Sequence, residues 1–299
     1  QLDWAQVPGL ADTLGANGVS SNYSFDLAPR TWEMIRALRK GTAVFMMPSG
    51  PIKCGGAPQK IAYLAADYWQ RHGRLGDIKV VMALPSPAIF GVPEFACVLD
   101  SVVARYGIDL RLQTVVTEVR PGSKEVVLHD AATDTSSTLG YDFLHAVPPQ
   151  SAPDWIKASP LAVPGDAKGW VDIDRHTMQH VRYPDVFALG DAGSSPNSKT
   201  GAAIRKQAPV VAQNVIDHLA GRPVTRHYDG YSSCPIVTAH NRMLLCEFDY
   251  TGKPHPTVPL IDTRKERFDM YLLKRYGLPL LYWQLMMRGY AMSTPQPAA

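Results

Sequence analysis

The sequence predicts an α/β protein of about two domains. In the first half of the chain, apolar runs of strand length alternate with helical patterns, as in a sheet covered by helices. At 299 residues the chain is long enough for two cores of ordinary size. Prolines gather between residues 148 and 164, which indicates a domain boundary near residue 150.

The elements are expected in a regular order. In the first half, helical spacing predicts helices over 30–38, 59–70 and 95–106. Apolar runs bounded by turn residues predict strands over 43–48, 77–83, 110–119, 125–129 and 143–147. In the second half we expect a strand over 169–173, a buried strand over 183–191 that ends in Gly-Asp, and a long helix over 200–219. This alternation is typical of a nucleotide-binding α/β domain.

Composition excludes several classes of function. Hydrophobic residues make up 45% and charged residues 19%, and a net charge of +3 without a block of like charge predicts no nucleic-acid partner. Four cysteines are too few for a disulfide scaffold, and without a C-x-x-C pair we expect no metal site. The longest apolar stretch, 278–287, is shorter than the roughly 20 residues of a membrane-spanning helix. No targeting segment is visible before the first globular pattern.

Two cysteines stand in settings that favour redox chemistry. Cys54 and Cys234 each lie in a turn rich in Gly, Ser or Pro, beside an apolar run. A helix N-terminus or a neighbouring Lys53 or Lys60 would lower the pKa of such a thiol and raise the thiolate population. For either cysteine alone, an ordinary small residue in a tight loop is the favoured interpretation, but the two together favour a redox pair. The other two cysteines, at 97 and 246, have apolar neighbours and are expected to be buried thiols without a role.

A strand that ends in Gly190-Asp191 resembles the second flavin-binding motif of flavoproteins with two dinucleotide-binding domains. There the Asp accepts a hydrogen bond from the hydroxylated chain of FAD, and the Gly leaves room for the cofactor. The alternative is that Asp191 caps the following helix.

The long helix that follows opens with small residues. Its backbone N–H groups over Gly201, Ala202, Ala203 and Ile204 could stabilise negative charge at the edge of a flavin, and Lys199 could strengthen that field. Alternatively, Lys199 is a solvated loop lysine.

Taken in order, the motifs resemble one family, sulfide:quinone oxidoreductase, and most closely its mitochondrial-type branch. They are the segments 53–60 (KCGGAPQK), 88–92 (AIFGV), 187–191 (FALGD), 198–200 (SKT) and 228–235 (YDGYSSCP), extended by 241–242, 246–250, 281–283 and 287–290. The resemblance implies an α/β, Rossmann-like, three-layer flavoprotein with two dinucleotide-binding domains and C-terminal amphipathic helices.

The resemblance also implies a mechanism. Cys54 and Cys234 would form a disulfide, sulfide would attack Cys234 and leave a persulfide there, and the freed Cys54 thiolate would pass two electrons to FAD. Ubiquinone would then accept the electrons, and a thiol or another nucleophile would take the sulfur. The residues implied to contact FAD are Lys60, Asp191, Lys199, Gly201, Ala202, Ala203 and Ile204.

The C-terminal region suits a membrane surface. Apolar and aromatic residues over 268–290 are interleaved with Lys and Arg, which predicts two short amphipathic helices split by Gly277-Leu278-Pro279. Such helices could instead pack on the protein, but an insoluble quinone favours monotopic contact, on a bacterial or mitochondrial inner membrane. Phe248 and Tyr250 are candidates for the quinone pocket.

The chain departs from the family in one respect, because no G-x-G-x-x-G motif for the FAD pyrophosphate occurs in it. We therefore expect a fragment, with a remnant of the FAD domain over 1–40, a second Rossmann-like domain over 41–150, a return to the FAD domain over 151–230, and a quinone and membrane region over 231–299. Because Cys54-Gly55-Gly56 replaces a phosphate loop, no NAD(H) binding is expected. The alternatives are a flavoprotein like flavocytochrome c sulfide dehydrogenase and an inactive, flavin-free, membrane-associated remnant.

Overall fold

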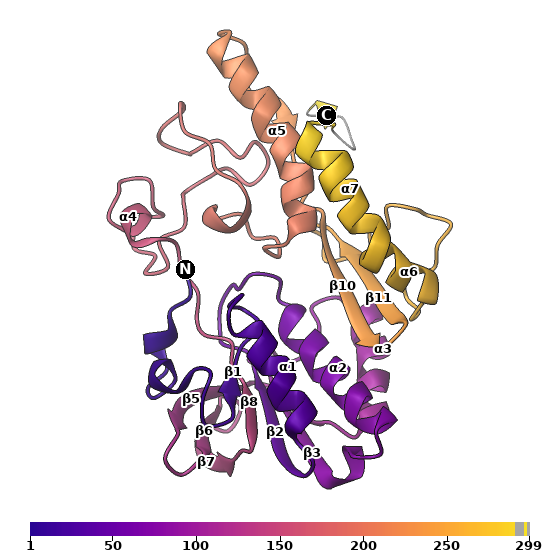
Figure 1. Ribbon diagram of the computed structural model, residues 1–299. Coiled ribbons are helices and arrows are strands. Elements are labelled where there is room, and N and C mark those ends of the chain that lie inside the picture. Colours follow the sequence, from indigo (N-terminus) through magenta and orange to yellow (C-terminus); the bar gives the residue numbers. More distant parts are fainter. Residues whose placement is uncertain (291–295, 298–299) are drawn as a thin grey trace.

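The computed structural model describes residues 1–290 and the backbone of 296–297. Figure 1 shows a sheet with its helices in one half of the molecule, and α5 and the C-terminal helices in the other. The sheet has five parallel strands in the order β1-β8-β2-β3-β4. Their bounds are β1 Val19–Ser20, β2 Gly41–Met46, β3 Ile78–Ala83, β4 Asp109–Arg111 and β8 Phe143–His145.

Both faces of this sheet are covered, so its central strands β2 and β3 are mostly apolar, as the sequence predicted. From β2, Ala43 and Phe45 share a core with the helices α2 Ala57–Arg71 and α3 Pro93–Tyr106. The alternate residues Val44 and Met46 share a second core with an antiparallel meander. Its strands are β5 Thr114–Arg120, β6 Glu125–Asp130 and β7 Thr135–Gly140. The predicted three-layer α/β architecture is confirmed.

The first forty residues lie against this sheet. Strand β1 pairs with β8, and helix α1 Ala28–Ala37 follows it. Residues 19–37, which the sequence analysis grouped with a remnant of the FAD domain, therefore belong to the same sheet and its covering helices as residues 41–150. The domain boundaries stay predictions.

The segment 151–230 has little regular strand structure. It contains the short helix α4 Asp154–Lys157 and the long helix α5 Gly201–Leu219. The strands expected over 169–173 and 183–191 are wrong, because these residues make isolated bridges such as Gln179 with Phe187. Residues 186–189 are also only half-buried. An apolar run becomes a strand only where neighbouring strands take up its N–H and C=O groups.

A hairpin connects this segment to the sheet half. Strands β10 Ser232–Ala239 and β11 Arg242–Phe248 pair antiparallel and pack against α2. The two-residue strands β9 Arg226–His227 and β12 Gln296–Pro297 form a small separate pair. Short 3₁₀ turns complete the elements at Trp4–Gln6, Ala11–Thr13, Leu75–Asp77, Gly190–Ala192 and Met286–Arg288.

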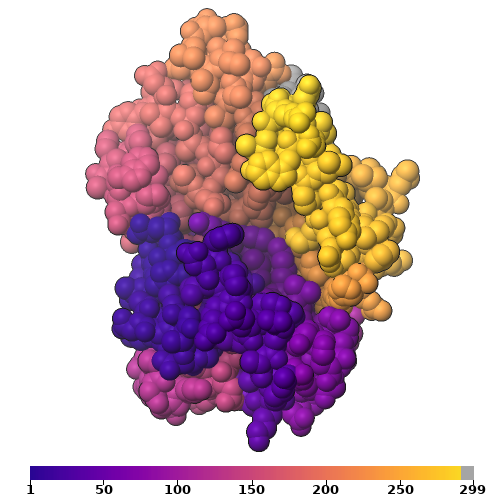
Figure 2. Space-filling view, viewed as in Figure 1, coloured from indigo at the N-terminus to yellow at the C-terminus, as the bar shows by residue number. Residues whose placement is uncertain are grey.

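The C-terminal region forms one bent helical rod. Helix α6 Phe268–Leu272 continues through a π-helical turn, Leu273–Gly277, into α7 Leu278–Gln284. The predicted break at Gly277-Leu278-Pro279 is absent, because Gly277 and Leu278 are both helical and the π-helical turn leads directly into α7. Figure 2 shows this yellow segment lying on the outside of the molecule.

Candidate functional site

Three segments hold the Cys54 loop at the carboxyl end of β2. The backbone N–H of Cys54 donates to the Lys199 carbonyl at 2.7 Å, and the Tyr23 hydroxyl donates to the Lys53 carbonyl at 2.8 Å. The backbone N–H of Ala57 donates to the Cys54 carbonyl at 2.7 Å, just as α2 begins. Cys54 has φ +49°, a left-handed conformation that non-glycine residues rarely adopt, so these contacts fix its thiol in place.

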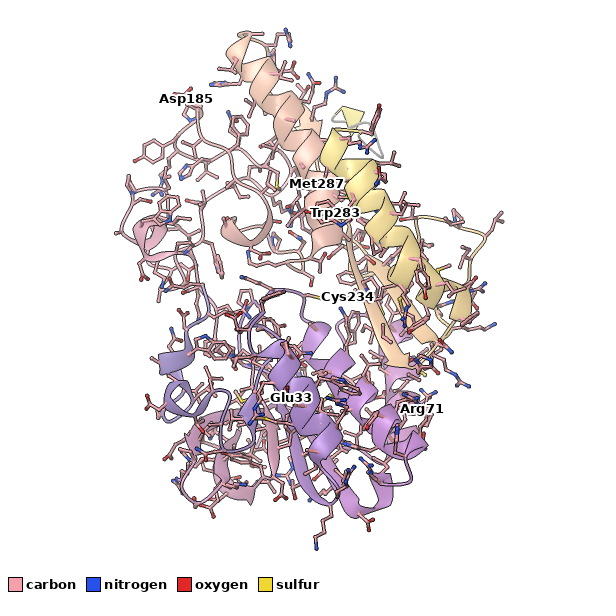
Figure 3. All side chains as sticks on the ribbon, viewed as in Figure 1. Glu33, Arg71, Asp185, Cys234, Trp283 and Met287 are labelled. Carbon is pink, nitrogen blue, oxygen red and sulfur yellow. The ribbon has the colours of Figure 1, made fainter. Side chains whose placement is uncertain are left out.

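The hairpin brings Cys234 to this loop. Cys234 lies on β10 and is 1% exposed, and Figure 3 labels it where the hairpin meets the sheet half. Gly56 permits the approach, because a Cβ at that position would lie 3.3 Å from the Cys234 Cβ. Two cysteines 180 positions apart in the sequence are thus neighbours, and both are free thiols in this structure.

The two thiols differ strongly in acidity. A hydrogen bond between the cysteines is the largest influence, and it lowers the pKa of Cys54 to about 5 although burial acts in the opposite direction. The Lys60 ammonium donates to the Cys54 Sγ at 3.2 Å and lowers that pKa further. The same hydrogen bond and its own burial raise the pKa of Cys234. Cys54 is therefore the thiolate of the pair, and Cys234 is the protonated donor.

A second lysine, which the sequence analysis did not single out, lies near the pair. Lys274 is on the π-helical turn, and its charge helps to lower the pKa of Cys54. Burial and the Lys60 charge lower the pKa of Lys274 itself to about 8. No motif or spacing signals it, since Lys274 stands 40 positions after Cys234 in an amphipathic segment.

An open cavity of about 480 Å³ reaches Cys234. The residues around it include Gly55, Phe90, Arg175, Asn197, Phe248 and Tyr250. Cys234 lines this cavity, whereas the Cys54 side chain is not among its lining groups. A small nucleophile in the cavity therefore meets the sulfur of Cys234 first. The two aromatic residues proposed for a quinone pocket, Phe248 and Tyr250, lie here.

The start of α5 adjoins the Cys54 loop. The backbones of Lys199 and Lys53 form an isolated parallel β-bridge. The Thr200 hydroxyl caps the helix by accepting from the Ala203 N–H at 3.2 Å. Thr200, and not Asp191, is therefore the cap, so the capping alternative for Asp191 is wrong. The first amides of the helix, over Gly201 and Ala202, have no acceptor within the helix.

Lys199 is not a solvated loop residue, since it is 6% exposed. Its ammonium donates to the Gly193 carbonyl at 2.6 Å and lies 4.2 Å from the centre of the Trp170 ring. Burial lowers its pKa to about 8, and the charge of Asp191 opposes that shift. The structure thus brings Lys199, Asp191, Cys54 and the start of α5 to one place.

Buried polar atoms at this place fit a further polar group. The side-chain Oε1 of Gln150 accepts from the Lys53 backbone N–H at 2.9 Å. The Gln150 Nε2 and the Ser151 Oγ, however, have no hydrogen-bond partner within the described part of the chain. Buried polar groups without partners are costly, so these atoms suit a bound molecule with polar edges. Together with the helix start and Lys199, they fit the donor and acceptor pattern of a flavin.

One expectation about the remaining thiols is wrong. Cys97 is exposed on the outer side of α3, whereas Phe95 and Leu99 on that helix are buried. Cys246 is buried, as predicted. Among the described residues, no cluster of three or more His, Cys, Asp or Glu side chains is suited to a metal ion.

No protein-family model matches the chain. It is 39% identical over 292 residues to the mitochondrial sulfide:quinone oxidoreductase of Mus musculus, an alignment of 97% of this chain with 64% of the relative. The corresponding protein of Dictyostelium discoideum is 40% identical over 290 residues, covering 97% of this chain and 63% of the relative. The chain thus spans slightly less than two thirds of the length of these curated relatives.

Solved structures share the fold. The sulfide:quinone oxidoreductase of Aquifex aeolicus superposes with a TM-score of 0.76 at 15% identity, over 96% of this chain and 68% of that one. A chain in the mitochondrial ATP synthase of Tetrahymena thermophila superposes with a TM-score of 0.78 at 20% identity, over 94% and 70%. The predicted α/β, Rossmann-like fold class is therefore confirmed.

Proposed function

We propose that this chain belongs to a sulfide:quinone oxidoreductase and carries its sulfide-oxidising centre, with FAD as cofactor. One observation carries the proposal: Cys54 and Cys234 lie together, and the Lys60 ammonium lies 3.2 Å from the Cys54 sulfur, where it lowers the pKa of that thiol. This asymmetry suits a dithiol that cycles through a disulfide, because a stabilised thiolate is a good leaving group. The likeness to the mouse and Dictyostelium enzymes supports the same chemistry.

The chemistry at sulfur begins from the oxidised pair. Hydrosulfide enters the cavity and attacks the Cys234 Sγ, a new S–S bond forms, and the bond to Cys54 breaks. Cys54 leaves as a thiolate that Lys60 and Lys274 stabilise, and the two electrons of the broken bond stay on its sulfur. Cys234 then carries a persulfide that faces the cavity. A thiol or another nucleophile takes the outer sulfur, so Cys234 returns to a thiol.

The start of α5, Lys199 and Asp191 would hold FAD beside the Cys54 loop. When bound, FAD supplies the two-electron acceptor that regenerates the disulfide. The role of this chain is to offer donors: the free amides of Gly201 and Ala202 and the buried ammonium of Lys199 favour negative charge at that place. We propose no NAD(H) site, because the loop after β2, where a dinucleotide phosphate would lie, is instead built around Cys54.

The outer face of the C-terminal rod would lie on a membrane that supplies the quinone. Its large apolar side chains are exposed at Tyr276, Leu280, Trp283, Met287 and Tyr290. Arg275 and Arg288 on the same segment are exposed and suit the headgroup level. No helix of the described chain is both long and apolar enough to cross a bilayer. We propose peripheral attachment to the mitochondrial inner membrane, as the relatives' mitochondrial names suggest.

Absorption spectroscopy tests the proposal. The purified 299-residue chain is mixed with FAD, freed of unbound cofactor, and treated with sulfide without oxygen; addition of decylubiquinone follows. We expect retained yellow colour, bleaching by sulfide and recovery with the quinone. Cys54→Ser and Cys234→Ser should each abolish the bleaching, while the matched control Cys97→Ser, on the exposed thiol, should retain it. Retained flavin that sulfide does not bleach, or bleaching that survives both substitutions, would contradict the proposal.

A further inference from the structure

A third thiol, at Cys246, faces Cys234 across the hairpin. The two residues are register partners of β10 and β11, and they are 1% and 0% exposed. Both belong to the core between the hairpin and α2. Directly paired residues of antiparallel strands have Cα atoms about 4.5 to 5.5 Å apart, within the range of about 4.4 to 6.8 Å that a disulfide spans. The hairpin register therefore places Cys234 and Cys246 at a backbone spacing that suits a disulfide.

The surroundings of Cys246 distinguish it from an isolated buried cysteine. It interacts electrostatically with Cys234 and with Lys60, the same lysine that contacts Cys54. Cys234 thus stands between two thiols, Cys54 on the loop before α2 and Cys246 on the neighbouring strand. The sulfide chemistry described above uses only Cys54.

We propose that Cys246 is a second exchange partner of Cys234 and forms an alternative disulfide that withdraws Cys234 from turnover. This rests on the proposed function in one respect, because the Cys54–Cys234 disulfide is the oxidant. The Cys246 sulfur attacks the Cys234 Sγ, the Cys234–Cys246 bond forms and the Cys54–Cys234 bond breaks. Cys54 leaves as a thiolate with the electron pair, and the Cys246 proton passes to solvent. The number of disulfides is unchanged, so no outside oxidant is needed.

The leaving group and the nucleophile set the direction and the speed of this exchange. Cys54 leaves readily because Lys60 stabilises its thiolate. Burial raises the pKa of Cys246, so little of its attacking form is present and the exchange is slow. Sulfide in the cavity therefore reaches Cys234 first when sulfide is abundant. When sulfide is absent, the alternative disulfide accumulates, and the return attack by Cys54 restores the reactive pair.

Trypsin separates the three cysteines, which makes a direct test possible. Cleavage after lysine and arginine gives peptides 54–60, 227–242 and 243–264, each with one of them, since Pro254 protects the bond after Lys253. The whole chain is oxidised with diamide, freed of oxidant, incubated without sulfide, blocked with N-ethylmaleimide and digested without reduction. Mass spectrometry then measures which peptides are linked.

We expect the link between 54–60 and 227–242 to decline while the link between 227–242 and 243–264 grows, at a constant total. In Cys54→Ser, diamide should produce the second link directly. In Cys246→Ala, and in the better-filling variant Cys246→Val, the first link should persist. Over the same incubation, the fraction of wild-type chain that sulfide can reduce should fall about twofold or more, but should stay constant in these variants.

The outcomes separate this inference from the proposed function. A stable link between 54–60 and 227–242 in the wild type, with no second link even in Cys54→Ser, would overturn the role of Cys246 and leave the sulfide chemistry standing. If peptides 54–60 and 227–242 are linked in neither the wild type nor Cys246→Ala, the Cys54–Cys234 disulfide does not form. That result would contradict the proposed function itself. The exposed Cys97 is replaced by Ser in the reference chain as well as in every variant, so this thiol forms no links between molecules.

Discussion

Replacing Lys60 should raise the pKa of Cys54, because it removes the hydrogen bond from the Lys60 ammonium to the Cys54 sulfur. The Lys60 ammonium donates to the Cys54 sulfur at 3.2 Å, and the pKa of Cys54 is about 5. A hydrogen bond to a charged group contributes about 1.5–3 kcal/mol, and about 1.4 kcal/mol corresponds to one pKa unit. Lys60→Met should therefore raise the pKa of Cys54 to roughly 6–7. At pH 6 the thiolate fraction would fall from about nine tenths to between roughly a half and a tenth.

The rate of alkylation by iodoacetamide against pH measures this shift on the reduced chain. Cys97→Ser serves as the background, and the buried thiols of Cys234 and Cys246, whose pKa values are raised, should not react near pH 6. Lys53→Met is the matched control, because Lys53 precedes Cys54 directly but its side chain is exposed. An alkylation profile that Lys60→Met leaves unchanged, or that Lys53→Met shifts equally, would refute the role given to Lys60.

Three further perturbations test other parts of the structure. Gly230 has φ +88° and a Cβ there would lie 2.1 Å from the Tyr250 ring, so Gly230→Ala should lower the free energy of unfolding in urea by at least about 1–3 kcal/mol; unchanged stability would contradict this packing. Tyr23→Phe removes the donor to the Lys53 carbonyl and should speed amide hydrogen exchange in the Cys54 loop, whereas unaltered exchange would mean that this bond does not hold the loop. Trp283→Asp should weaken sedimentation with phosphatidylcholine vesicles by about tenfold or more, and equal binding would exclude this face from the membrane contact.

Local patterns predicted the sheet half well. In β2, α2 and α5 the apolar residues follow the period of the element, because they form the face that becomes buried. The sequence pattern therefore predicts both the element and its buried face. The same reasoning failed where burial depends on distant partners. Residues 186–189 are apolar but have little strand pairing, and Cys97 has apolar neighbours yet lies on the solvent side of its helix.

The candidate site was predicted in its residue types more than in its geometry. Cys54 and Cys234 were singled out by their turns and by family resemblance, but no spacing rule brings residues 180 positions apart together. Lys274 and Cys246 reach the site only through tertiary structure, by a π-helical turn and by hairpin register. The sequence offered both Lys53 and Lys60 as lysines that could lower the pKa of Cys54. In the structure, the 3.2 Å contact with the Cys54 sulfur is made by Lys60.

The central claim is that sulfide attacks Cys234 and releases Cys54, and the position of the added sulfur tests it most directly. The oxidised chain is treated briefly with sulfide, trapped with iodoacetamide, digested with trypsin and analysed by mass spectrometry. Attack at Cys234 should leave peptide 227–242 with one added sulfur atom, while peptide 54–60 is alkylated without extra sulfur. Extra sulfur on peptide 54–60, with Cys234 alkylated as a simple thiol, would show that sulfide attacks Cys54 instead.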